Sequence, residues 1–87
     1  MAFRLDAPAP NPFRGETSLR YAVPRRCRVA VKLYDISGRE VKTLVDSVRD
    51  PGVYQAAVKG HDLSPGVYFC LLWTDGFVAT QKLVLTR

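Results

Sequence analysis

The side chains that could support catalysis in this 87-residue chain are four serines, two cysteines and one histidine. Nucleophilic catalysis requires the nucleophile to lie beside a base that a third group orients. The serines fall in predicted strands or turns that bring no base beside them, and His61 lies in a Gly-His-Asp turn where a surface position is expected. We therefore predict that the chain has no catalytic residues and is not an enzyme.

The residues that could bind a metal ion are scattered as well. Cys27 and Cys70 belong to no Cys-x-x-Cys pair, and a single histidine cannot complete a zinc site. The aspartates flank predicted turns, their usual structural place, and lack the dense spacing of a calcium loop. We predict no metal and no cofactor. The cysteines could form one disulfide in an oxidising compartment, but their unequal heights on the predicted strands favour two free thiols.

The net charge of +5 comes mostly from arginine, and Arg20, Arg25, Arg26 and Arg28 lie close together. A groove for nucleic acid would place exposed aromatic residues between such cations. The only aromatic residue nearby is Tyr21, which falls on the apolar phase of its segment. We interpret the cluster as a solvated face and predict no nucleic-acid partner. No apolar run approaches the roughly 20 residues of a membrane span.

Short segments of alternating polarity, separated by turn signals, must position these side chains. This pattern predicts an all-β sandwich or barrel, and the length fits one domain. The proline-rich residues 7–14 are expected to form a linker or a loop that leads into the domain, with Phe13 as a plug beneath the sheet. The expected strands cover residues 3–5, 17–23, 28–34, 40–46, 52–59, 66–74 and 77–86.

The tetrapeptide Pro-Gly-Val-Tyr occurs twice, at residues 51–54 and 65–68. Proline at the second and glycine at the third position of a turn are typical of type II, in which the glycine adopts a positive φ. Valine and tyrosine then favour the start of a strand. We therefore interpret the repeat as a turn followed by a strand start, used twice.

The segment 67–73 is apolar on both faces, which predicts a central strand buried on both sides. Its parity places Tyr68 and Trp73 on opposite faces, which argues against a flat aromatic platform for sugars. In residues 40–46 the apolar phase slips between Val41 and Leu44, which predicts a β-bulge.

With the strands placed, the chain resembles the immunoglobulin-like C-terminal sorting domains of type A in the type IX secretion system. The flagellar hook-capping protein carries a related domain. The resemblance covers about residues 11–87 and rests on the order and spacing of several motifs. The matching segments are Asn11-Pro12-Phe13, the hairpin of residues 31–41 with its continuation 44–46, residues 62–69, and Lys82-Leu83-Val84-Leu85.

The resemblance implies an immunoglobulin-like antiparallel β-sandwich of about seven strands over residues 11–87, with residues 1–10 as an N-terminal linker or edge strand. It also implies a non-catalytic sorting signal on a secreted or surface-displayed bacterial protein. Residues 1–10 carry no apolar signal-peptide core, so we expect export to depend on a longer parent protein. The predicted contacts with the secretion machinery are Asp35, Gly38 and Arg39 of the hairpin and Lys82, Leu83, Val84, Leu85 and Arg87 of the terminal strand.

Two other functions remain open at this point. The first is an assembly or spacer module, similar to the hook-capping domain, that packs against neighbouring domains or self-associates through an edge strand. The second is a carbohydrate-binding accessory domain, which would depend on Trp73 or Tyr54. Concentration-dependent self-association would favour the first, and retention on polysaccharide would favour the second.

Overall fold

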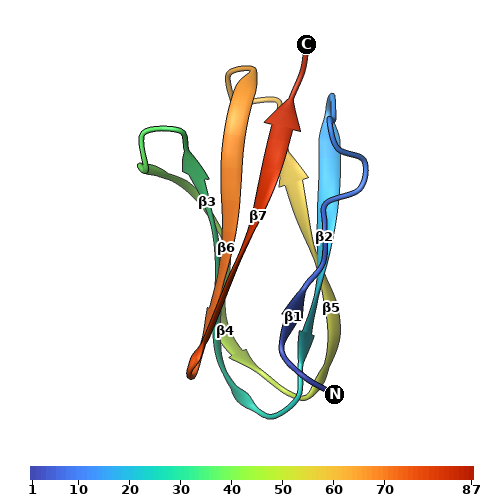
Figure 1. Ribbon diagram of the computed structural model, residues 1–87, viewed down its shortest axis with the longest axis vertical. Helices are drawn as coiled ribbons and strands as arrows, with labels where there is room; N and C mark the ends of the chain where they lie inside the picture. Colours follow the sequence, from blue (N-terminus) through green and yellow to red (C-terminus); the bar gives the residue numbers. More distant parts are fainter.

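The computed structural model describes all 87 residues as seven β-strands in two antiparallel sheets that pack face to face (Figure 1). It contains no helix that is long and apolar enough to cross a bilayer. The predicted immunoglobulin-like β-sandwich is confirmed. The strands are β1 (Arg4–Leu5), β2 (Glu16–Val23), β3 (Cys27–Asp35), β4 (Glu40–Arg49), β5 (Gly52–Lys59), β6 (Gly66–Thr74) and β7 (Phe77–Leu85).

The smaller sheet has the strand order β1-β2-β5 and the larger sheet the order β4-β3-β6-β7. In Figure 1 the smaller sheet lies on the right and the larger sheet on the left. The edge strands are therefore β1 and β5 in one sheet and β4 and β7 in the other. Strands β3 and β6 are antiparallel neighbours with Asp35 opposite Tyr68, so the β3–β4 turn and the β5–β6 loop emerge at the same end of the molecule.

One hydrophobic core fills the space between the sheets. Alternation places Leu19 and Tyr21 of β2 against Val29, Val31 and Leu33 of β3, and all five side chains are at most 1% exposed. Burial of a valine or leucine of this kind contributes roughly 1.5–3 kcal/mol. Phe13 is 2% exposed beneath the sheets, so its predicted role as a plug is confirmed.

The predicted bulge in β4 is confirmed, and a second bulge accompanies it. Val31 pairs with Val45 and the next residue of β3 pairs with Thr43, so Leu44 is the extra residue of the first bulge. Leu33 pairs with Lys42 and Tyr34 pairs with Glu40, so Val41 is the extra residue of the second bulge. Bulges bend a strand and increase its twist, and β4 runs three residues beyond the predicted end at residue 46.

The type II turns predicted at the two Pro-Gly-Val-Tyr segments are wrong. Gly52 has no positive φ, and the φ of Gly66 is 152°, far from the roughly 80° that a type II turn requires. Both glycines already belong to strands. Each tyrosine closes its corner instead: Tyr54 Oη donates to the carbonyl of Asp50 (2.6 Å) and Tyr68 Oη to that of Ser64 (2.5 Å). The repeat is thus a pair of tyrosine corners, a device found in immunoglobulin-like sandwiches.

Strand β6 is central in its sheet, as predicted, but it is not buried on both sides. Its inward residues Tyr68, Cys70 and Leu72 are at most 7% exposed. Its outward residues, among them Phe69 and Trp73, are only half-buried because no third layer covers this face. The apolar residues on the outer face therefore form surface.

Candidate functional site

The β3–β4 turn is organised by one carboxylate. Asp35 Oδ1 accepts hydrogen bonds from the Ser37 N–H (3.0 Å), the Ser37 hydroxyl (2.7 Å) and the Arg39 N–H (3.0 Å). The Gly38 N–H donates to the carbonyl of Asp35 (3.0 Å), and Gly38 supplies the positive φ of 89° that closes the turn. The sequence-based interpretation of Asp35 and Gly38 as turn formers is confirmed.

These hydrogen bonds lower the pKa of Asp35, with the Ser37 hydroxyl as the largest cause and the Arg39 backbone N–H as the next. The Arg39 Nε atom lies 3.3 Å from Asp35 Oδ2, while the arginine side chain is 79% exposed. Asp35 is consequently committed to the turn, whereas Arg39 presents a cation to solvent. Ile36, which the sequence reasoning did not single out, is 77% exposed at the tip.

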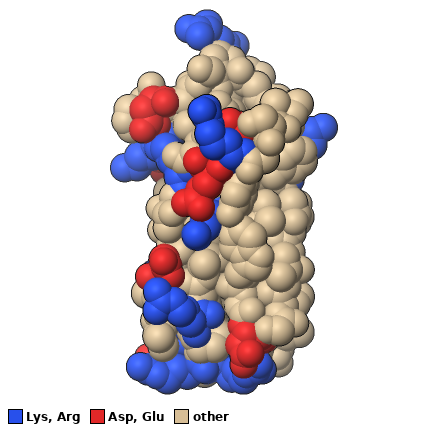
Figure 2. All heavy atoms as spheres, turned by 90° about the vertical axis from the view of Figure 1, so that its left-hand side faces the viewer, with Lys and Arg blue, Asp and Glu red and all other residues tan.

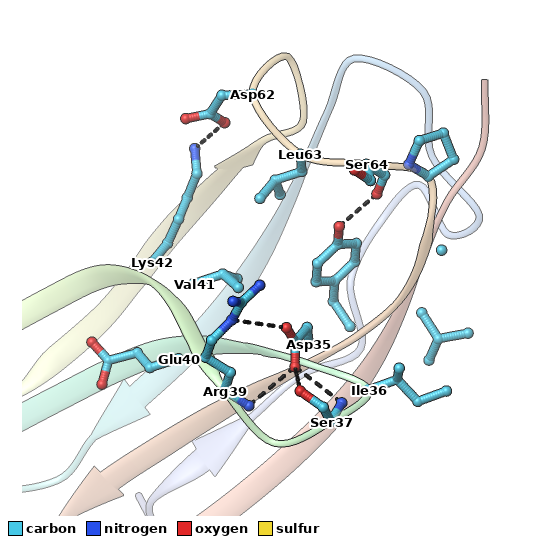
Figure 3. Close-up of a pocket in the computed structure, with 14 residues that line it drawn as sticks. Asp35, Ile36, Ser37, Arg39, Glu40, Val41, Lys42, Asp62, Leu63 and Ser64 are labelled. Atoms are coloured by element: carbon cyan, nitrogen blue, oxygen red, sulfur yellow. Dashed lines mark hydrogen bonds and ion pairs between the residues drawn. The ribbon is translucent and has the colours of Figure 1, made fainter.

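A cleft of about 600 Å³ separates this turn from the β5–β6 loop (Figure 3). Tyr68, Val41 and Leu63 give it an apolar floor, and charged side chains stand around its mouth. Lys42 Nζ connects its two walls because it lies 2.8 Å from Asp62 Oδ1 and donates to the carbonyl of Lys59 (3.1 Å). This contact with Lys42 is the largest cause of the lowered pKa of Asp62.

The cleft offers apolar side chains at its floor and charged side chains at its mouth. No group of three or more His, Cys, Asp or Glu side chains comes together to hold a metal ion. The Ser37 hydroxyl is taken up by Asp35, and Ser64 contributes its carbonyl to the corner of Tyr68. The cleft can therefore receive a partner side chain by shape, with apolar contacts below and charge above.

The C-terminal half of β7 is joined along its free edge to the N-terminal segment. Asn11 Nδ2 donates to the carbonyl of Lys82 (3.0 Å), and Asn11 Oδ1 accepts from the Val84 N–H (2.9 Å). The Phe13 N–H donates to the carbonyl of Val84 (2.9 Å), and the Phe13 carbonyl accepts from the Thr86 N–H (2.8 Å). The motif Asn-Pro-Phe thus occupies the edge of the terminal strand from residue 82 to residue 86.

The predicted contact residues on this strand divide into two groups. Leu83 and Leu85 are 0% and 6% exposed and pack in the core, so they support the fold. Lys82 and Arg87 are exposed, and Val84 is half-buried on the outer face. Residues 85–87 lie beside the β5–β6 loop, around a second hollow of about 300 Å³. The terminal strand and the β3–β4 hairpin therefore reach the same end of the sandwich.

We define the hairpin end as residues 36–39, 60–65 and 86–87. Below it, on the outer face of the larger sheet, Tyr34, Ile36, Phe69, Leu71 and Trp73 line a groove of about 500 Å³. This face points toward the viewer in Figure 2, where charged side chains gather at the two ends and along one side, and a broad area carries none. Sequence reasoning missed this groove because it treated the outward residues of β6 as buried.

The aromatic residues of this face do not form a flat platform. The rings of Tyr34 and Trp73 meet edge to face, with an angle of 79° between their planes. Tyr54 stacks on buried Tyr21 and is not part of the same face. Carbohydrate recognition by coplanar rings has no supporting geometry here.

Three arginines of the cluster, Arg25, Arg26 and Arg28, lie at the opposite end from the hairpin and pair with aspartates, whereas Arg20 lies within β2 and forms no ion pair. Arg25 Nη2 is 3.1 Å from Asp75, and Arg28 Nη2 is 2.8 Å from Asp46. Arg26 forms a third exposed pair with Asp50. This arrangement agrees with the interpretation of the cluster as a solvated face.

Comparison with known protein families matches residues 9–86 to the model described as the secretion system C-terminal sorting domain. No curated protein matches the chain. The matched residues include the hairpin, both tyrosine corners and the terminal strand, so the family match covers the hairpin end except for Arg87.

Proposed function

We propose that this chain, which belongs to the family of secretion system C-terminal sorting domains, is a non-catalytic signal that the type IX secretion machinery reads as a folded surface. Domains of this family mark proteins that are exported and then released or displayed at the cell surface. We place the recognised surface at the hairpin end.

The observation that supports this placement is the convergence of separate motifs. Residues 36–39, 60–65 and 86–87 come from three parts of the sequence and surround two adjoining hollows. Tyr68 and Lys42 fix the β5–β6 loop, and Asp35 fixes the turn opposite it. A rigid, preorganised surface binds with a smaller loss of conformational entropy than flexible loops do. The folded domain can therefore present a defined shape to a receptor.

We propose that some residues of this surface contact the partner directly and that others hold the surface in shape. Arg39 and Arg87 would provide charge, and Ile36 would provide an apolar contact that continues into the groove beside Trp73. Asp35, Gly38, Leu83 and Leu85 would act through the fold, because their groups are used in the turn or buried in the core. The proposed partner is the secretion machinery, reached by a docking contact and without any reaction on this chain.

The first test is an export assay with a fluorescent reporter that is directed to the periplasm of a host with an active type IX system. The reporter carries residues 1–87 at its C-terminus, and the comparison fusion lacks residues 82–87. We expect the full fusion to reach the surface or medium and the shortened one to stay behind, because the latter loses Leu83 and Leu85 from the core. Periplasmic retention of a soluble, folded full fusion would contradict a sorting role.

A further inference from the structure

The four sheet edges differ in how their backbone groups are protected. Natural sheets shield their edges from other strands by shortness, bulges, charge or a covering segment. Strand β1 has two residues and β4 has two bulges and several charged residues. Residues 11–13 cover β7 along its C-terminal half, which leaves the shorter stretch of residues 77–81. Strand β5 has eight residues in regular register with β2 and none of these protections.

The hydrogen bonds of β2 show which backbone groups of β5 are free. In an antiparallel strand the groups of successive residues point alternately to the two sides. The Ser18 N–H donates to Ala9 and the Arg20 carbonyl accepts from Asp6, so both residues bond toward β1. The odd-numbered residues of β2 consequently bond toward β5.

The register then fixes the free groups of β5. The odd-numbered residues of β2 pair with even-numbered residues of β5, for example Leu19 with Ala56. The N–H and C=O groups of Val53, Gln55 and Ala57 therefore point away from the sheet, and these three side chains are exposed. A partner for this edge must be an extended strand, since it has to satisfy alternating donors and acceptors.

Both ends of the free stretch are bounded. Pro51 has no N–H to donate. The carbonyl of Lys59 already accepts a hydrogen bond from Lys42 Nζ (3.1 Å). The available residues are therefore 53, 55 and 57, and this set is symmetric about Gln55.

We infer that β5 pairs antiparallel with β5 of a second copy of this chain, with Gln55 opposite Gln55 across a two-fold axis. In this register Val53 of one copy lies opposite Ala57 of the other. The outward side chains of both copies lie on the same face of the joined sheet, so the two three-stranded sheets form one continuous sheet. Residues 53–57 carry no charge, so no like charges oppose each other. An identical strand in antiparallel orientation is thus complementary to itself.

The contact is short, so the pairing is a concentration-dependent association and not a permanent dimer. It uses the side of the molecule formed by β5 and not the hairpin end. The inference goes beyond the sorting role, and either one could fail while the other holds.

Cysteine cross-linking tests the register directly. In a Cys27→Ser background we would compare Gln55→Cys with Ala57→Cys under mild oxidation, while Cys70 stays buried. Opposed residues in a hydrogen-bonded antiparallel pair have Cα atoms about 5.5 Å apart, within the range of a disulfide. The two copies of residue 57 would be roughly 14 Å apart along the strand, from about 3.4 Å per residue. We expect the first variant to cross-link and the second not to.

A proline variant tests the pairing without a cross-link. Ala57→Pro removes an outward N–H and should keep the fold, because edge strands tolerate proline where the N–H faces solvent. Val48→Pro on β4 is the matched control. The odd-numbered residues of β3 form their hydrogen bonds toward β4, as the bond from the Asp35 N–H to Arg39 shows, and they pair with odd-numbered residues of β4, for example Val29 with Ser47. The N–H of the even-numbered Val48 therefore points outward, as that of Ala57 does.

In sedimentation over a range of concentrations, the unchanged chain and Val48→Pro should form dimers at high concentration, and Ala57→Pro should remain monomeric with a similar melting temperature. The inference is overturned if the unchanged chain stays monomeric throughout, if folded Ala57→Pro dimerises equally well, or if Ala57→Cys cross-links as readily as Gln55→Cys.

Discussion

The two ends of the sandwich use the same chemistry and reach different shapes. Each end has a tyrosine corner and an exposed arginine that pairs with an aspartate: Tyr68 and Arg39 at the hairpin end, Tyr54 and Arg26 at the opposite end. The hairpin end encloses a cleft of about 600 Å³ between two fixed walls. The opposite end has a shallower hollow of about 290 Å³ beside Trp73.

The two ends differ little in the exposed ion pairs that could stabilise the fold, and they differ more in the surface features that a partner could recognise. Exposed ion pairs contribute little to stability, with typical values of about 0–1 kcal/mol. The exposed Arg39 and Arg26 side chains are therefore expected to contribute about equally little to the free energy of folding. The hairpin end differs in its enclosed shape, in exposed Ile36 and in the terminal strand that reaches it. This difference leads us to expect that stability variants and export variants will map to different residues.

The largest expected effect comes from removing the plug beneath the hairpin end. Phe13→Ala should lower the free energy of unfolding by about 3–5 kcal/mol, because it leaves a cavity where a fully buried ring was. Phe77→Ala at the opposite end is the matched control, since its half-buried ring stacks on Phe3 with 5.4 Å between centroids. Urea unfolding of both variants measures the two losses. A larger loss at Phe77 than at Phe13 would contradict the account.

The two tyrosine corners offer a closer comparison. Tyr68→Phe should lower the free energy of unfolding by about 1 kcal/mol, because it removes a partly buried hydrogen bond to the carbonyl of Ser64. Tyr54→Phe should cost less than about 0.5 kcal/mol, because water can replace its exposed bond to Asp50. Thermal unfolding of the two single variants checks the order. Equal losses of stability in the two variants would contradict the expected difference between the corners.

The turn aspartate should make stability at the hairpin end depend on pH. The pKa of Asp35 is lower in the folded chain than in the unfolded chain. The stabilisation that the ionised carboxylate gives to the fold is therefore fully present above the unfolded carboxyl pKa of about 3.9, and it is lost as the pH falls through the folded pKa. Asp35→Asn should therefore be less stable than the unchanged chain at neutral pH, and the difference should shrink in acid.

Melting temperatures between neutral pH and strong acid provide the measurement for Asp35→Asn. Asp50→Asn at the opposite end is the control, since Asp50 forms an exposed pair with Arg26 and should affect stability little at any of these pH values. A difference for Asp35→Asn that stays constant down to strong acid would contradict the assigned role of its hydrogen bonds.

The parts of the fold that the sequence predicted depend on local rules. Alternation located the strands, and the Asp-x-x-Gly pattern located the turn at Asp35 and Gly38, because both follow from neighbouring residues. The corners were misassigned because the tyrosine hydroxyls close them, and no rule for proline and glycine includes that bond. The burial of β6 was overestimated because apolar residues on both faces do not show how many layers a fold has.

The candidate site depended on contacts between distant residues, which the sequence could not predict. Asn11 reaches Lys82 across 71 positions and Val84 across 73. Lys42 joins the cleft walls by reaching Asp62 from another strand. Sequence reasoning therefore named the hairpin and the terminal strand but missed Ile36 and the cleft between the hairpin and the β5–β6 loop.

One paired measurement tests the central claim that the hairpin end carries the sorting signal. Arg39→Glu and Arg26→Glu each reverse one exposed arginine that pairs with an aspartate, at opposite ends of β3. Each variant of residues 1–87 is fused to the periplasmic reporter, and its melting temperature is compared with that of the unchanged domain. We predict that Arg39→Glu reduces export several-fold while Arg26→Glu does not, with both variants folded. Equal export of the two, or a loss confined to Arg26→Glu, would contradict the account.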